Sequence, residues 1–104
     1  MEPANLLSPG VEPAYLRLYI ARSTPNSVRA QQNLATVLAK FRGRDDIKIE
    51  TIDVFAQPKR ALVDGVVVTP TLIGTSAVKR MVLMGDLANH DYLHQSLQSF
   101  LNLD

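Results

Sequence analysis

The chain has 104 residues, 46% of them hydrophobic and 20% charged, with a formal net charge of +1. This length and composition are typical of one globular domain, and the near-neutral balance indicates neither nucleic acid nor an anionic membrane as a partner. The absence of cysteine excludes disulfides, thiolate metal sites and iron–sulfur clusters. No apolar stretch approaches the roughly 18 residues of a membrane span and the first residues lack a basic signal-like region, so we expect a cytoplasmic protein.

Residues 1–13 contain three prolines and a glycine with little apolar periodicity, which predicts a disordered leader followed by one domain over residues 14–104. The first strand of that domain is predicted from Tyr15 to Ala21, where apolar residues alternate at every second position. A helix is expected directly afterwards. Thr24 is suited to cap its N-terminus, and Pro25 is suited to its first position. One apolar face then continues to Phe41, and Gly43 ends the helix.

A second strand is predicted over Ile47 to Val54, where β-branched residues are frequent. Pro58 begins a short helix through Val63, and Gly65 supplies the positive φ that stops it.

The following residues predict a third strand over 66–73, a turn over 74–77 and a fourth strand over 78–84. Gly85 and Asp86 end the fourth strand. Apolar residues at helical spacing then predict an amphipathic helix over 89–103. The order βαβαββα predicts a three-layer α/β/α domain. The assignment of 78–84 stays open, because periodicity alone does not separate a short apolar strand from buried helix.

Two short motifs resemble a thioredoxin-like scaffold. Ser23-Thr24-Pro25-Asn26 stands where thioredoxins carry Cys-x-Pro-Cys, and Thr69-Pro70 stands in the loop whose cis-proline faces that motif. The resemblance implies a cis bond before Pro70. Because Ser23 and Asn26 replace both thiols, the site is unable to perform disulfide exchange, which requires an attacking thiolate.

Longer runs resemble the KaiB family from Tyr15 to Leu103. They are Leu16 to Ala21, Thr24 to Ala30, Ile52 to Val54, Thr69 to Leu72 and Gly85 to Leu87. The resemblance implies a regulator without catalytic activity or cofactor that binds the N-terminal ATPase ring of KaiC. In cyanobacteria that complex sequesters KaiA. The motif residues that carry the resemblance are Thr24, Pro25, Asn26, Thr69, Pro70, Gly85 and Asp86.

KaiB-like chains adopt two folds, a thioredoxin-like monomer that binds KaiC and a tetramer-forming ground state of order βαββααβ. The helical period between Leu93 and Leu101 favours the thioredoxin-like state here, because that period serves no purpose in a strand. The ground state and its homo-oligomer remain the alternative.

Two other functions are open. One is a sensor module like the KaiB-resembling N-terminal domain of the clock kinase SasA. The other is a glutathione-transferase-type enzyme in which Ser23 activates glutathione and the Pro70 loop holds its backbone.

Basic residues are the candidate partner contacts, because they can complement an acidic partner surface. The alternative is that these side chains are simply exposed to solvent or prevent a strand edge from pairing with another strand. The candidates are Arg29, Lys59, Arg60, Lys79 and Arg80. His90 and His94 have metal-like spacing, but no third ligand accompanies them, so we assign no metal.

Overall fold

The structure is a computed structural model that describes residues 14–41 and 47–101. The predicted leader, Gly43 and Leu103 lie outside these described residues. Within them, no helix has the length and apolar character needed to cross a membrane.

Among the described residues, seven elements follow one another in the predicted order βαβαββα. They are β1 (Ala14–Ile20), α1 (Pro25–Leu38), β2 (Ile47–Asp53), α2 (Pro58–Val63), β3 (Thr71–Thr75), β4 (Arg80–Met84) and α3 (His90–Leu101).

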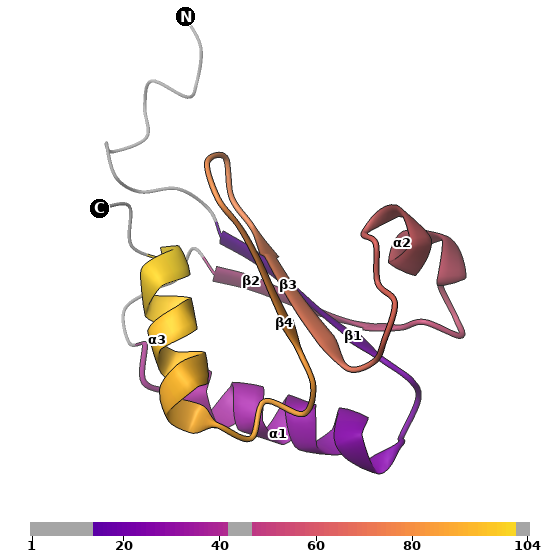
Figure 1. The fold of residues 1–104 in the computed structure, drawn as a ribbon, viewed down its shortest axis with the longest axis horizontal. Helices are drawn as coiled ribbons and strands as arrows, with labels where there is room; N and C mark the ends of the chain where they lie inside the picture. The colour runs from indigo at the N-terminus through magenta and orange to yellow at the C-terminus, as the bar shows by residue number, and fades with distance from the viewer. Residues whose placement is uncertain (1–13, 42–46, 102–104) are drawn as a thin grey trace, which may run out of the picture.

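The strands form one four-stranded sheet in the order β2-β1-β3-β4. β2 runs parallel to β1, whereas β3 and β4 are antiparallel to their neighbours. Figure 1 shows α1 and α3 together on one side of the molecule and α2 away from them. The chain therefore has the predicted thioredoxin-like arrangement, and the ground-state order is not the one observed.

Two hydrophobic clusters lie on opposite faces of the sheet, because alternate residues of β1 point to opposite sides. The larger cluster joins Leu16 and Leu18 to Leu34 of α1 and Leu97 of α3. The smaller cluster joins the buried Tyr19 to Ile52, Ala61 and Ile73 beneath α2. The helices thus cover both faces, which confirms the three layers.

The start of β3 differs from the prediction, because residues 66–70 are not a strand and β3 begins at Thr71. Thr71 pairs with Tyr19, and β1 ends one residue later at Ile20. Only Pro70, which has no N–H to donate, lies opposite Ile20, and the residues before it extend beyond the end of β1. The β-branched run of valines misled the sequence prediction.

The hairpin turn also lies later than predicted. Gly74 and Thr75 belong to β3, and the turn covers residues 76–79, where the Ser76 N–H donates to the Lys79 carbonyl at 3.0 Å. β4 therefore begins at Arg80 rather than at Val78.

Helix α1 ends earlier than predicted, and α3 begins one residue later than predicted. α1 ends at Leu38, and the next residues form tighter bonds, such as that from the Phe41 N–H to the Leu38 carbonyl at 2.9 Å. Phe41 thereby leaves the helix and stacks on His94 with ring centroids 5.0 Å apart. α3 begins after Asn89, whose side chain accepts the Tyr92 N–H at 3.0 Å and caps the helix.

Candidate partner interface

Four connections emerge at one end of the sheet. β1 and β2 end there, since Ile20 pairs with Asp53. β3 begins there and β4 ends there, since Thr71 pairs with both Tyr19 and Met84. Both sequence motifs lie in these connections. We call this region the motif surface and define it as residues 21–26, 54–57, 66–70 and 85–87.

The start of α1 is held differently from the prediction. Pro25 occupies the first turn and Thr24 the N-cap position, as expected, but the Thr24 side chain makes no capping hydrogen bond. Its hydroxyl bonds instead to Ser27 Oγ at 2.9 Å, and Ser27 Oγ accepts the Ala21 N–H at 3.0 Å. The fully buried Ser27 therefore ties the end of β1 to α1, whereas the side-chain cap predicted for Thr24 is not formed.

Ser23 is exposed at the position where thioredoxins carry a thiol. Activation of a serine needs an adjacent base. The two histidines of the chain are engaged elsewhere, since His90 Nε2 lies 2.8 Å from Asn33 Oδ1 and His94 stacks on Phe41. In the described ranges 14–41 and 47–101, no cluster of three or more His, Asp or Glu side chains is placed to hold a metal ion.

The Pro70 loop packs against the end of β4. The Thr69-Pro70 peptide is cis, as the resemblance to thioredoxins implied. The Gly85 N–H donates to the Pro70 carbonyl at 2.9 Å, and Gly85 itself has a φ of +103°, which favours glycine. The motif residues Thr69, Pro70 and Gly85 therefore meet in space although they are far apart in sequence.

A polar bridge connects α1 with residues 85–87. Arg29 Nε donates to Asp86 Oδ2 at 3.3 Å, and the Arg29 guanidinium also bonds to Asn26 Oδ1. Asn33 Nδ2 donates to the Asp86 carbonyl at 2.8 Å. One partner candidate, Arg29, and two motif residues, Asn26 and Asp86, are thus brought together.

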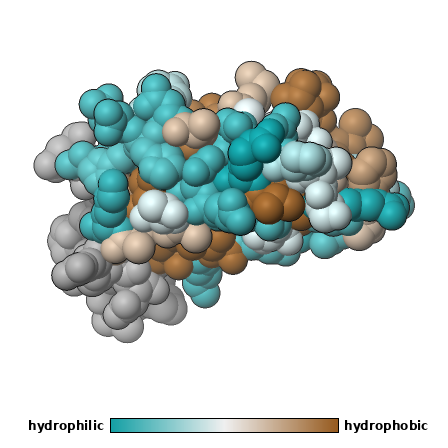
Figure 2. Space-filling model, turned by 90° about the horizontal axis from the view of Figure 1, so that it is seen from below, coloured by the Kyte–Doolittle hydropathy of each residue, from teal (hydrophilic) through white to brown (hydrophobic). Residues whose placement is uncertain are grey.

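Apolar side chains are exposed on the same surface. Phe55 is 59% exposed, Val67 is 84% exposed and Val68 is 49% exposed. The Arg22 guanidinium carbon lies 4.8 Å from the centre of the Phe55 ring, a cation–π contact. Figure 2 shows hydrophobic side chains gathered toward the right-hand end of the molecule, where α2 lies in Figure 1.

The sequence prediction missed these apolar residues because it placed the valines inside the third strand. A signal was present: Gly65 and Thr69-Pro70 bracket the run, and turn residues on both sides of three residues leave little room for a strand.

The other basic candidates do not join Arg29. Arg60 binds Glu50, with Nη1 2.6 Å from Oε2, and Lys59 lines a cavity of about 360 Å³ beside α2. Arg80 donates to the Asp64 carbonyl at 2.9 Å, and Lys79 donates to the Ser99 carbonyl at 2.7 Å beside α3. Arg29 therefore lies apart from the other four candidates, of which Lys59 and Arg60 line the cavity beside α2 and Lys79 and Arg80 line the groove between β4 and α3.

A buried polar cluster lies beneath α2. Arg17, which is 7% exposed, pairs with Asp64 at 2.7 Å, and the Tyr19 hydroxyl also donates to Asp64. Burial opposes ionisation of the Asp64 carboxyl, but the hydrogen bonds from Arg17 and Tyr19 outweigh it and hold its pKa below the usual value. These contacts join β1 to the end of α2 and support the fold below the surface.

A family model and individual relatives of known name both match this chain, and they indicate the same family. The KaiB domain matches residues 17–99. The circadian clock oscillator protein KaiB of Thermosynechococcus vestitus is 40% identical over 77 residues, which are 73% of this chain and 69% of that protein. The circadian clock protein KaiB3 of a Synechocystis strain is 41% identical over 76 residues, covering 71% of this chain and 72% of that protein.

Two solved structures have the same fold as this chain. The N-terminal domain of SasA from Synechococcus elongatus superposes with a TM-score of 0.72 and 30% identity, over 91% of this chain and 90% of that domain. Thioredoxin from Trypanosoma brucei brucei superposes with a TM-score of 0.67 at 17% identity, over 94% of this chain and 81% of that protein. The second similarity shows the fold alone.

Proposed function

This chain belongs to the KaiB family of circadian clock proteins, and we propose that it is a non-catalytic clock or stress-signalling regulator that binds the ATPase ring of a KaiC-like protein. The observation that carries the proposal is the extent of the KaiB match, residues 17–99. That range contains the whole motif surface.

The chemistry of the motif surface supports binding rather than catalysis. Ser23 and Asn26 take the places of the thioredoxin thiols, and no histidine lies against Ser23. Exposed apolar side chains next to charged ones are typical of a surface that recognises a protein. We therefore assign partner contacts to Phe55, Val67 and Val68, with Arg29 at the rim.

We propose the remaining basic candidates as further partner contacts that lie outside the motif surface. Lys59, Arg60, Lys79 and Arg80 complement an acidic partner surface, which acts mainly on the association rate and on specificity. The protein acts in the cytoplasm in this proposal, and KaiA or a SasA-type kinase are its further partners.

Fold switching is part of the proposal. The thioredoxin-like arrangement is the form that binds the KaiC-like ring, and the ground-state tetramer is a storage form separated from it by a few kcal/mol. Backbone chemical shifts of the free protein test this step. Extended shifts at Val82 and helical shifts at Leu97 are expected for the binding form. Helical shifts at Met81 with extended shifts at Leu97 would assign the free protein to the ground state, and binding would then draw on a minor population.

A second candidate function is a sensor module of the SasA type. The similarity to the SasA N-terminal domain, at a TM-score of 0.72, favours it. Co-purification of the chain with a histidine kinase that it activates, in preference to a KaiC-like ATPase, would support this alternative.

Three parallel assays test the proposed function. The purified chain is expected to be retained by the KaiC-like ATPase of the same organism in at least one nucleotide state. It is expected to leave insulin disulfides intact and to catalyse no glutathione conjugation, with thioredoxin and a glutathione transferase as positive controls. Absence of binding in both nucleotide states would contradict the proposed partner. Insulin reduction or glutathione conjugation would contradict the non-catalytic assignment.

A further inference from the structure

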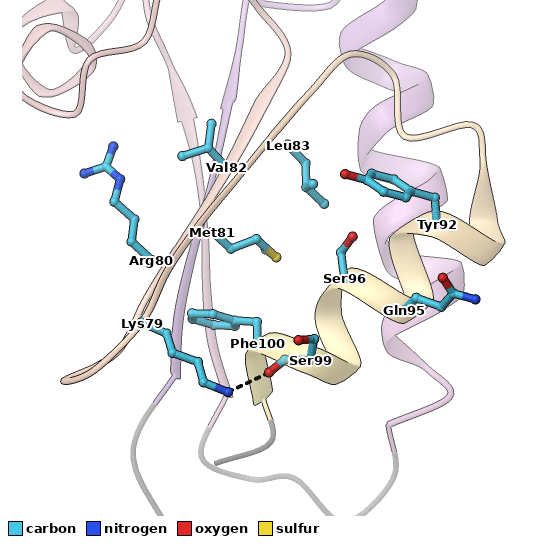
Figure 3. A pocket seen from close by; sticks show the side chains of 10 residues that line it. All are labelled: Lys79, Arg80, Met81, Val82, Leu83, Tyr92, Gln95, Ser96, Ser99 and Phe100. Atoms are coloured by element: carbon cyan, nitrogen blue, oxygen red, sulfur yellow. Dashed lines mark hydrogen bonds between the residues drawn. The ribbon is translucent and has the colours of Figure 1, made fainter. Parts of the chain in front are cut away.

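Strand β4 forms one edge of the sheet, and among the described residues only β3 pairs with it. A groove of about 550 Å³ runs between this strand and α3. Figure 3 shows Met81 and Leu83 pointing from β4 toward the helix, and Ser96 and Phe100 pointing back toward the strand. A second cavity, of about 420 Å³, shares Leu83 with the groove and continues over residues 84–89. The hollow therefore extends along the whole of β4.

The hydrogen-bond pattern places alternate backbone groups of β4 on the open side of the strand. Gly85 directly follows β4, and its N–H donates to the Pro70 carbonyl at 2.9 Å, so the odd-numbered residues bond to the β3 side. Backbone groups of successive residues in a strand point to opposite edges. The N–H and C=O groups of Arg80, Val82 and Met84 therefore point outward, away from β3.

The two ends of the hollow differ in charge. Lys79 and Arg80 line the groove, and the described residues that line it include no Asp or Glu. These two side chains donate to the backbone carbonyls of Ser99 and Asp64. Asp86 borders the second cavity, at the other end of β4. A ligand on this edge therefore meets positive charge where β4 begins.

We propose that the edge of β4 binds an extended segment of a partner protein, which adds to the four-stranded sheet as an antiparallel strand and carries acidic residues at its C-terminal end. An antiparallel segment runs from Met84 toward Arg80, so its C-terminal end lies beside Lys79 and Arg80. The outward groups of β4 then form hydrogen-bonded residue pairs with the segment, with about six main-chain hydrogen bonds. This mode of recognition combines main-chain bonds with pockets for alternate side chains.

The groove and the second cavity suit alternate side chains of such a segment. The residues opposite Met81 and Leu83 point toward α3, because directly opposite residues share a face of the sheet. Their side chains are about 7 Å apart along the segment, so one enters the groove and the other the second cavity. Met81, Leu83 and Phe100 line the groove with apolar surface, which suits small aliphatic side chains such as valine. The acidic residues follow opposite Arg80 and Lys79, where the charges are complementary.

A second copy of this chain does not supply the required segment. Strand β4 itself contains no acidic residue, so pairing of two β4 strands leaves their basic ends without an opposite charge. The proposal therefore describes a one-to-one complex of a monomeric chain with an acidic segment of another protein. It does not rest on the KaiC-like partner proposed for the motif surface.

A synthetic peptide tests the binding. The labelled sequence Thr-Val-Thr-Val-Glu-Glu places its valines opposite Leu83 and Met81 and its glutamates opposite Arg80 and Lys79. We expect saturable binding to the full chain with a Kd between about 10 µM and 1 mM, because a short strand buries little area. The matched peptide Thr-Val-Thr-Val-Lys-Lys should bind about tenfold more weakly or less at low salt. Absence of saturable binding by the acidic peptide, or equal affinity of the two peptides, would overturn the proposal.

Hydrogen exchange of the natural chain locates the bound peptide. Saturation with the acidic peptide should slow the exchange of the outward amides of Arg80, Val82 and Met84. The amides of Met81 and Leu83 already bond to β3 and should change little. Slower exchange at another part of the chain, with the outward amides of β4 unchanged, would contradict the proposed site. Concentration-dependent dimers of the free chain in sedimentation would assign the edge to a second copy and would also contradict it.

A pair of variants tests the main-chain bonds. Val82→Pro removes one outward N–H and no hydrogen bond to β3, so it should weaken peptide binding by about tenfold or more. The matched variant Val82→Thr keeps that N–H and a branched Cβ, and it should bind like the natural chain. Native circular dichroism checks both variants. Equal affinity of the two folded variants for the acidic peptide would refute strand addition at β4.

Discussion

Arg17 and Asp64 form an ion pair that joins the middle of the sheet to the end of α2, with Arg17 Nε 2.7 Å from Asp64 Oδ2. Removal of one partner leaves the other charge poorly solvated, so the Asp64→Leu variant should lower the free energy of unfolding by about 3 kcal/mol. The double variant Arg17→Met, Asp64→Leu should recover part of that loss, since an apolar pair replaces both charges. Urea denaturation measures both. A double variant less stable than Asp64→Leu would contradict this account.

The carboxyl of Glu50 should titrate far below its usual range. A hydrogen bond from Arg60 and a second one from the Tyr15 hydroxyl lower its pKa to about 2. Because the folded pKa is depressed, the stabilisation from Glu50 is present above the unfolded value of about 4.3 and is lost as the pH falls toward 2. Carboxyl chemical shifts measured against pH test this. The Arg60→Gln variant should return the pKa toward its usual value. A Glu50 pKa near 4.3 in the natural protein would refute the interaction.

Gly74 leaves the space that the Phe100 ring of α3 occupies. A Cβ atom at position 74 would lie 3.0 Å from Phe100 Cε2 and from Leu16 Cδ2. The Gly74→Ala variant should therefore be destabilised by about 1–3 kcal/mol through overpacking. The cost should shrink in a Phe100→Leu background, which a double-mutant cycle by thermal denaturation measures. Equal costs in both backgrounds would show that Phe100 is not the obstacle.

Charge reversal should slow association with the KaiC-like partner and change its salt dependence while the fold stays intact. The strongest effect is expected for Arg29→Glu, because Arg29 lies beside the motif surface and pairs with Asp86. Stopped-flow or surface-based kinetics measure the rate. Lys48→Glu, on strand β2 and at the far end of the sheet, is the matched control. The interface would have to lie elsewhere if reversal leaves the kinetics unchanged at all five candidates, Arg29, Lys59, Arg60, Lys79 and Arg80.

The element order was predictable from sequence because most elements carry a strong local signal. Pro25 and Pro58 begin helices, Gly65 has the positive φ of +73° that stops α2, and Leu93 and Leu97 repeat with the helical period. These signals depend on residues close together in the sequence, so distant contacts in the folded protein do not override them.

The errors arose where distant partners decide the outcome. The start of β3 depends on where β1 ends, and Ser27 rather than Thr24 ties β1 to α1. The buried cluster of Arg17, Tyr19 and Asp64 joins residues 45 or more positions apart. No periodicity in the sequence indicates such a pairing. Nor does any sequence pattern indicate that Arg29 lies apart from the other four basic candidates.

Equilibrium binding to the KaiC-like ATPase of the same organism tests the central claim most directly. The labelled chain should bind saturably, and Phe55→Asp should weaken binding by about tenfold or more, since it places a charge in an apolar contact. Ile49→Asp alters a half-exposed isoleucine of strand β2, outside the motif surface and outside the five basic candidates, and should bind like the natural chain. Absence of saturable binding in every nucleotide state, or equal weakening by the two variants, would contradict the claim that this chain recognises its partner through the motif surface.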